Sequence, residues 1–288
     1  MKKHVLLTVS EDVSALYGVR FTAAFIQNKD MLEITLLYVA QGPEGWKSAT
    51  CPLPAESESG LSDNQCARGQ AALDAARHLL IDKGFREESV RTKLLNKRFG
   101  TVRDIAREAK AGLYDAVVFG RRGYILFEKT LATSVSREMM EHRINFPIWI
   151  CRMPEENRKG VLVCVDDSEP SMRIADHVGF MLQNEDQHPI TLMHVSAGRR
   201  DEADAAIQKA EQHLKANGIE DRRIRRLVIP GSRVVNIILD ELESGRYAVV
   251  AVGRGGSESR GILDKWFMGS VSMKLLETLD KAVLWVSK

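Results

Sequence analysis

The sequence predicts an α/β protein made of two tandem copies of one domain, each an open parallel sheet flanked by helices. A length of 288 residues favours two domains. Several short blocks recur in the same order in the two halves. Within each half, short β-branched runs alternate with stretches in which apolar residues repeat at helical spacing. Such alternation requires parallel strands joined by right-handed crossovers.

The internal repeat fixes the domain boundaries that we expect. Residues 6–10, 34–39, 114–123 and 133–140 match residues 162–166, 190–195, 247–256 and 269–276, and the run around Trp149 matches the run around Trp285. We therefore predict domains at 1–153 and 158–288, joined by a short charged segment containing Pro154. The first copy also carries extra residues 42–66, rich in Pro, Gly and Ser, which predict a long loop that is mobile or covers the first-copy crevice.

Each element of the second copy can be assigned in order. Strands are predicted at 161–165, 190–195, 224–229, 248–252 and 282–286, and helices at 171–183, 201–216, 232–243 and 269–279. The first and fourth runs are apolar throughout, as central parallel strands are. The third carries Arg225 and Arg226, which suit a sheet edge. The pattern predicts a five-stranded sheet of order 3-2-1-4-5 in each copy.

The last strand of each copy is predicted to lie at the opposite sheet edge. Residues 147–151 and 283–287 are apolar, and an exposed apolar edge favours strand pairing. Because the two copies are fused, each edge is at high effective concentration for the other. We expect an intramolecular pseudo-dimer, which is compatible with a further homodimer.

Composition indicates an ordinary globular protein. Hydrophobic residues make up 44% and charged residues 28%, and the formal net charge is +2. That balance implies neither a nucleic-acid nor a membrane partner. The N-terminal apolar run is too short for a signal peptide, so we expect a cytoplasmic protein. The four cysteines form no C-x-x-C pair, which argues against zinc, and a reducing compartment disfavours a disulfide between Cys51 and Cys66.

Polar and glycine residues follow the first and fourth strands of the second copy. Asp166 ends strand 1, and Gly253 and Gly256 follow strand 4. The next helix opens with Gly269, Ser270, Val271 and Ser272. Glycines allow close backbone approach, and a helix N-terminus offers free N–H donors to an anion, so the pattern is compatible with a phosphate cradle. The alternative is a tight turn followed by a helix cap. A Walker A loop is absent, because no G-K-[ST] occurs.

These motifs resemble those of the universal stress protein family, which has a strand-1 aspartate and the motif G-x2-G-x9-G-[ST] after strand 4. The second copy keeps these residues but holds twelve residues between Gly256 and Gly269. The resemblance implies an ATP site. Its second-copy residues would be Asp166, Val195, Gly253, Gly256, Gly269, Ser270, Val271 and Ser272.

The first copy departs from the family pattern at two positions. Gly120, Gly123 and Ser134 keep the family spacing, but Thr133 stands in place of the third glycine and Ser10 in place of the aspartate. A β-branched residue is poorly suited to a left-handed backbone, and a serine supplies no charged acceptor. We therefore expect a weaker first-copy site and one dominant nucleotide site per chain.

Other chemistries have weaker support. A receiver domain needs an aspartate after strand 3, where this chain has Ile229–Gly231. The Asp166–Asp167 pair could bind Mg²⁺, but we favour Asp167 as a helix or turn cap. The arginines at 222–226 could contact nucleic acid, but protection of a sheet edge is the favoured interpretation. His194 is interpreted as packed or hydrogen-bonded, and residues 266–268 as packed on the sheet rim.

Two functions remain after this comparison. The first is a stress-response protein with an ATP-binding module that acts as a sensor or regulator. The second is a scaffold or small-ligand carrier with degenerate pockets. No catalytic constellation is present in the sequence, and slow ATP hydrolysis stays open.

Overall fold

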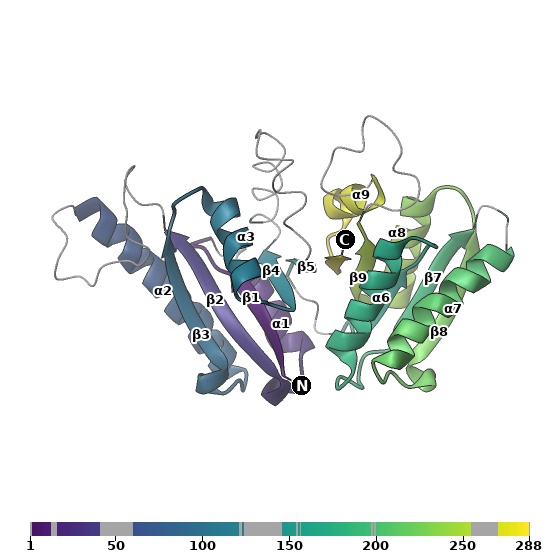
Figure 1. Ribbon diagram of the computed structural model, residues 1–288, viewed down its shortest axis with the longest axis horizontal. Coiled ribbons are helices and arrows are strands. Elements are labelled where there is room, and N and C mark those ends of the chain that lie inside the picture. The colour runs from purple at the N-terminus through teal and green to yellow at the C-terminus, as the bar shows by residue number, and fades with distance from the viewer. Residues whose placement is uncertain are drawn as a thin grey trace. The chain divides into compact units, whose positions relative to one another are not determined.

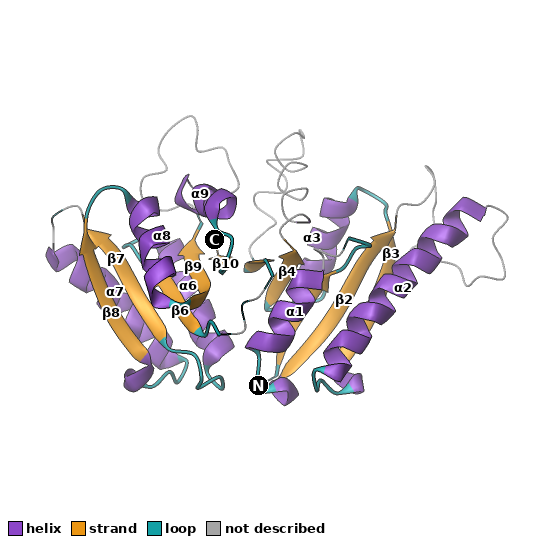
Figure 2. Ribbon diagram, turned by 180° about the vertical axis from the view of Figure 1, so that it is seen from behind, coloured by secondary structure: helices purple, strands orange, loops and turns teal. Residues whose placement is uncertain are grey.

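The chain forms two compact units, Met1–Phe146 and Pro147–Lys288. The computed structural model describes residues 2–12, 16–40, 60–120, 123, 146–153, 155, 157–196, 198, 200–254 and 270–287. Each unit is a mostly parallel α/β sheet with helices on both faces (Figures 1 and 2). The predicted fold class is therefore confirmed.

The first unit places its strands in the predicted order, β3-β2-β1-β4, and the neighbouring strands are parallel. Helices α1 and α2 cover one face and α3 the other (Figures 1 and 2). The strands are β1 Lys3–Thr8, β2 Leu32–Ala40, β3 Val90–Asn96 and β4 Ala116–Gly120. The helices are α1 Leu16–Phe25, α2 Gly60–Asp82 and α3 Thr101–Ala111, with short 3-10 turns at Lys29–Met31 and Glu87–Ser89.

The second unit has the order β8-β7-β6-β9-β10, which is the predicted 3-2-1-4-5. Helices α6 and α7 cover one face, and α8 and α9 the other. The strands are β6 Gly160–Cys164, β7 Ile190–Ser196, β8 Ile224–Pro230, β9 Tyr247–Gly253 and β10 Val283–Ser287. The helices are α6 Glu169–Leu182, α7 Arg200–Ala216, α8 Val234–Gly245 and α9 Ser270–Thr278, with a 3-10 turn at Asp221–Arg223.

A sixth strand, β5 (Ile148–Cys151), completes the second unit. It pairs antiparallel with β10, with Trp149 opposite Trp285, so the predicted pairing of the last strands is confirmed. The two indole rings stack with centroids 4.1 Å apart. The Trp149 indole N–H also donates to Nε2 of His177 in α6, at 3.0 Å. By sequence β5 ends the first copy, yet the unit boundary falls before it rather than near residue 153.

The core follows the predicted apolar runs. Val161, Leu162 and Val163 of β6 are fully buried, as are Val249 and Val250 of β9. Burial on both faces of these strands explains why their sequence is continuously apolar rather than alternating. The edge strand β8 is only partly buried along its length. The central pair β6 and β9 therefore forms a rigid base for whatever lies at its carboxyl end.

The insertion in the first copy is shorter as a loop than the sequence predicts. Helix α2 begins at Gly60, so residues 60–66 are helical rather than part of a 42–66 loop. No proline follows Pro54 in this segment, and Leu73, Ala76 and Leu80 lie at helical spacing and are fully buried. These buried side chains pack the helix against the protein core, and the helix continues toward its N-terminus through residues of turn-like composition. The expected mobility or crevice-covering role of the rest falls on residues 41–59, which lie outside the described residues.

Cysteine usage differs from expectation. Cys66 is disulfide-bonded, whereas Cys151 and Cys164 are free thiols. The prediction that Cys66 stays reduced is wrong, because a reducing compartment does not determine whether two cysteines lie close enough to bond. Across the described parts of the chain, we find no helix whose length and hydrophobicity would allow it to span a membrane.

Candidate functional site

The candidate site lies where the chain changes direction in the second unit. Strand β6 pairs in parallel with β7 on one side and with β9 on the other. From β6 the chain continues to α6 on one face, and after β9 it enters α9 on the opposite face. A crevice at the carboxyl ends of such a strand pair is the usual ligand site of an open α/β sheet. The sequence placed Asp166 and Gly253 at this point, and the structure puts both there.

Asp166 is held in a tight turn between β6 and α6. Its backbone N–H donates to Oγ of Ser171 at 2.9 Å, and its Oδ1 accepts the backbone N–H of Ser168 at 3.0 Å and the Ser168 hydroxyl. Ser168 is the N-cap of α6, because its Oγ accepts the backbone N–H of Ser171. The carboxylate is half-buried. No described residue donates to Oδ2, which leaves one carboxylate oxygen as an acceptor for a ligand.

Asp167 does not share this role. Its side chain is exposed and forms an ion pair with Lys209 of α7. The expectation that Asp167 caps the helix is wrong, because the shorter serine side chain at 168 occupies that position. The described residues contain no group of three or more His, Cys, Asp or Glu side chains arranged to hold a metal ion.

Gly253 meets the same turn of α6 from the other strand. A Cβ added to it would lie 2.6 Å from the carbonyl carbon of Pro170 and 2.6 Å from the backbone nitrogen of Ser171. Contacts that short are not tolerated, so only glycine allows β9 to end against this helix. Asp166 and Gly253 are thus joined through residues 168–171. This close packing explains the first glycine of the motif without reference to a ligand.

The remaining predicted residues are only partly brought to this point. Val195 is half-buried in β7 and pairs with Ile229, next to His194. Ser270 opens α9, Val271 is half-buried, and Ser272 is 2% exposed, so Ser272 faces the protein interior rather than solvent. Gly256 and Gly269 lie outside the described residues, as do residues 266–268. The proposed phosphate-binding half of the site is therefore defined by sequence alone.

The first-copy crevice has a different set of side chains. Ser10 replaces the aspartate, and its Oγ accepts the backbone N–H of Asp12 at 3.4 Å. Gly120 ends β4 and is buried, and Gly123 is exposed. Tyr38, at the end of β2, donates its hydroxyl to Glu11 at 2.9 Å. No carboxylate follows β1 at the position of Asp166, and Ser134 lies beyond the described residues.

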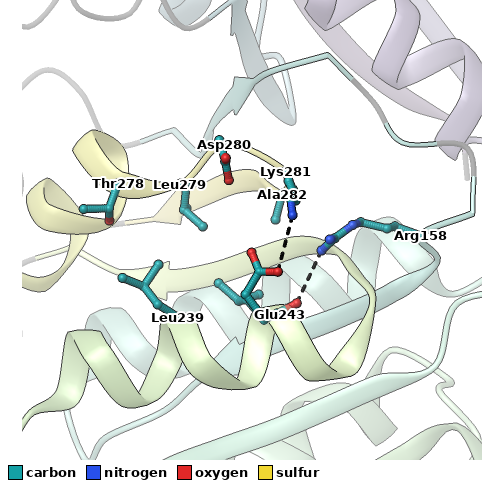
Figure 3. A pocket seen from close by; sticks show the side chains of 9 residues that line it. Arg158, Leu239, Glu243, Thr278, Leu279, Asp280, Lys281 and Ala282 are labelled. Atoms are coloured by element: carbon teal, nitrogen blue, oxygen red, sulfur yellow. Dashed lines mark hydrogen bonds and ion pairs between the residues drawn. The ribbon is translucent and has the colours of Figure 1, made fainter.

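A cavity of about 200 Å³ lies elsewhere in the second unit (Figure 3). It opens at the amino end of the sheet, since Lys281 and Ala282 line it just before β10 begins. Three of its charged side chains have partners: Arg158 donates to the Leu242 carbonyl oxygen at 3.3 Å, and Lys281 pairs with Glu243 at 3.4 Å. The cavity is thus at the opposite end of the strands from Asp166, and we do not assign the ligand site to it.

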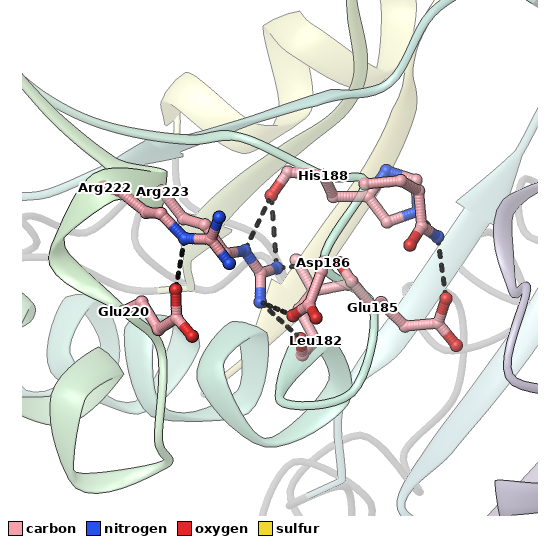
Figure 4. A network of polar contacts seen from close by, with 8 residues as sticks. Leu182, Glu185, Asp186, His188, Glu220, Arg222 and Arg223 are labelled. Atoms are coloured by element: carbon pink, nitrogen blue, oxygen red, sulfur yellow. Dashed lines mark hydrogen bonds and ion pairs between the residues drawn. The ribbon is translucent and has the colours of Figure 1, made fainter.

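Three arginines before and within β8 make structural contacts. Figure 4 shows the Arg223 guanidinium surrounded by carbonyl groups at the end of α6. It donates to the carbonyl oxygens of Leu182, Glu185 and His188 at 2.8–3.3 Å and is 6% exposed. Arg222 pairs with Glu220, and Arg226 with Glu211. Arg223 therefore caps the end of α6, and Arg226 ties the edge strand β8 to α7.

His194 lies at the site, although the sequence analysis gave it no functional role. Its Nδ1 lies 2.9 Å from the carbonyl oxygen of Val165, the residue before Asp166. A histidine at the end of a strand gives no specific signal by itself, because the contact depends on the register between β6 and β7. The repeat could have drawn attention to it, since Tyr38 stands at the same position in the first copy.

Comparison with known proteins places this geometry in context. Residues 157–287 match the model of the universal stress protein family. No curated protein matches the sequence of the chain.

Solved structures match the chain along its length. A universal stress protein from Archaeoglobus fulgidus DSM 4304 matches with a TM-score of 0.66 and 18% sequence identity, over 99% of this chain and 96% of that chain. One from Pseudomonas aeruginosa UCBPP-PA14 matches with a TM-score of 0.53 and 14% identity, over 100% of this chain and 93% of that chain. A universal stress protein solved in complex with cAMP matches over 45% of this chain and 95% of that chain, with 18% identity and a TM-score of 0.38. The first two matches show that the fold is shared.

Proposed function

Because residues 157–287 match the model of the universal stress protein family, we propose that the chain is a stress-response protein that binds an adenine nucleotide, ATP, in its second unit. In this proposal it acts as a sensor or regulator, and we assign no residue a catalytic role. The carrying observation is the half-buried Asp166 carboxylate at the switch point between β6 and β9, with Oδ2 not engaged by any described residue.

The chemistry of Asp166 fits the sugar or base of a nucleotide. A carboxylate oxygen accepts hydrogen bonds from ribose hydroxyls or from an amino group, and the charge strengthens these bonds. Its orientation does not depend on the ligand, because Ser168 and Ser171 fix the turn. Such preorganisation lowers the cost of binding. The phosphates would be bound by Gly256, Gly269 and the N-terminus of α9, as the family motif implies.

The alternative function is a scaffold or small-ligand carrier. It is favoured by the first copy, which has Ser10 and Thr133 in place of the family's aspartate and glycine. In the second copy the twelve-residue spacing before Gly269 also departs from the motif. We propose that the first unit has this supporting role and that the second unit carries the nucleotide.

Paired substitutions at the strand end test the proposal. Asp166→Asn keeps an oxygen to accept from Ser168 but removes the charge, and loss of a charge-assisted bond costs about 1.5–3 kcal/mol. We expect ATP affinity to fall by about tenfold or more in calorimetric titration. Asp167→Asn makes the same charge change at an exposed neighbour and should leave affinity within about twofold.

Two results would contradict the proposal. Equal effects of the two substitutions would remove Asp166 from the site. Absence of ATP binding by the wild-type protein, with and without Mg²⁺, together with no adenine-absorbing compound released on denaturation, would favour the scaffold function.

A further inference from the structure

The end of β6 is held to β7 by a side chain where the backbone ladder stops. The backbone N–H of Val165 donates to the Met193 carbonyl oxygen at 2.8 Å, which continues the ladder one residue beyond β6. The carbonyl oxygen of Val165 lies 2.9 Å from Nδ1 of His194. Because a carbonyl can only accept, Nδ1 must carry a proton, and this contact fixes the tautomer of neutral His194.

This bond acts directly on the residue that carries the proposed site. Val165 is 5% exposed and immediately precedes Asp166. On the other side, the Asp166 N–H donates to Ser171 in α6. The peptide between Val165 and Asp166 is therefore held from both sides, by His194 through its carbonyl and by Ser171 through its N–H. A peptide held at both groups cannot rotate, which sets the direction in which the Asp166 carboxylate leaves the backbone.

The first copy provides an internal comparison. There the Val9 N–H donates to the Leu37 carbonyl oxygen at 2.8 Å, as in the second copy, but Tyr38 replaces the histidine. The Tyr38 hydroxyl donates to Glu11 in the loop instead of to the strand. Burial and the hydrogen bond to Glu11 raise the pKa of Tyr38 to about 12, so it remains a donor at neutral pH. Gly69 makes room for the ring, since a Cβ there would lie 2.7 Å from it.

We infer that His194 is a positioning residue of the nucleotide site: its Nδ1–H bond to the Val165 carbonyl orients the Asp166 carboxylate toward the ligand. The identity of the ligand rests on the proposed function, whereas the bond between His194 and Val165 is observed in the structure. It also accounts for part of the difference between the copies, because the first copy lacks both the aspartate and the histidine.

The test uses two isosteric variants that separate the two ring nitrogens. In His194→Asn the amide nitrogen takes the place of Nδ1, whereas in His194→Gln it takes the place of Nε2. We expect ATP affinity within about threefold of wild type for the Asn variant and a loss of about tenfold or more for the Gln variant. Tyr38→Gln, at the same position of the first copy, should leave ATP affinity unchanged. Equal losses for Asn and Gln, or no loss for either, would overturn the inference.

A ligand-free measurement keeps this test separate from the proposed function. Nitrogen-15 spectra of the histidine side chains should show neutral His194 protonated at Nδ1, and amide exchange at Ser168 should be faster in the Gln variant than in the Asn variant. Protonation at Nε2 in the neutral ring would overturn the inference whether or not ATP binds. The Nδ1–H form without any ATP binding would leave the strand-end bond in place and overturn both the ligand role and the proposed function.

Discussion

At the scale of single residues, the first turn of α6 carries the site. Asp166 is hydrogen-bonded to this turn through Ser168 and Ser171, and Gly253 packs directly against the backbone of Pro170. The positions of Asp166 and Gly253 could be predicted, because both follow apolar strands in an alternating pattern. The identity of the cap and the clash that demands glycine could not, because both depend on neighbours that are distant in sequence.

Substitution of Gly253 tests that packing. We expect Gly253→Ala to lower the free energy of unfolding by about 1–3 kcal/mol, because β9 or the start of α6 must move to admit the methyl group. Thermal and urea unfolding measure the change. Gly123→Ala is the matched control, since among the described residues the nearest atom to an added Cβ there is 4.0 Å away. A stable Gly253→Ala protein would show that the contact is looser than described.

At the scale of elements, strand β5 belongs to one copy by sequence and to the other unit by structure. The chain places β5 at the end of the first copy, whereas the unit boundary and the pairing with β10 assign it to the second unit. The apolar pattern predicted the pairing itself. The unit boundary is not visible in a repeat, because a repeat aligns equivalent residues and says nothing about which copy a strand packs with.

Removal of the Trp149 ring should detach β5. Trp149→Ala loses the stack on Trp285 and the bond to His177, and buried Trp-to-Ala changes cost about 3–5 kcal/mol. Cys151, on the same strand, is fully buried, and burial raises the pKa of its thiol well above the ordinary value. We expect it to resist maleimide in the wild type and to react much faster in Trp149→Ala. Trp149→Phe should fall between them. Equal reactivity in all three would argue against a role of the indole in holding β5.

The edge strand β8 is tied to α7 through Glu211, and this link is sensitive to acid. Hydrogen bonds from Arg226 and then Lys215 lower the pKa of Glu211 below its ordinary value of 4.5. A lowered pKa in the folded state means that the link stabilises the protein above that range and is lost as the pH falls through the folded-state pKa.

We therefore expect Glu211→Gln to cost about 0.5–1 kcal/mol at neutral pH, in the range of a partly exposed ion pair. The difference from wild type should shrink in urea unfolding as the pH is lowered through the folded-state pKa of Glu211, which lies below its ordinary value, because the wild-type carboxylate then becomes protonated as well. Glu169→Gln, at an exposed pair on α6, is the control and should change stability little at either pH. A constant difference across this pH range would show that the effect is not electrostatic.

At the scale of the whole molecule, duplication followed by divergence explains why the two copies share a fold but differ in their site residues. In the described residues the two copies share strand order and the placement of their first three helices, and this much could be predicted from the repeat. They differ at the ends of their first two strands, where Ser10 and Tyr38 stand against Asp166 and His194. The replacement of Asp166 by Ser10 could be recognised from the repeat as the loss of a charge. The importance of His194 against Tyr38 could not, because it depends on the contact of His194 with Val165, which only the structure shows.

The number of ATP molecules bound per chain tests the central claim of one dominant site in the second unit. Calorimetric titration of the full-length protein should give a stoichiometry close to one. Binding should be weakened by Asp166→Asn and by Gly269→Val, and barely changed by Ser134→Ala in the first copy. Two equal sites, or a single site abolished by Ser134→Ala and indifferent to Asp166→Asn, would contradict the account.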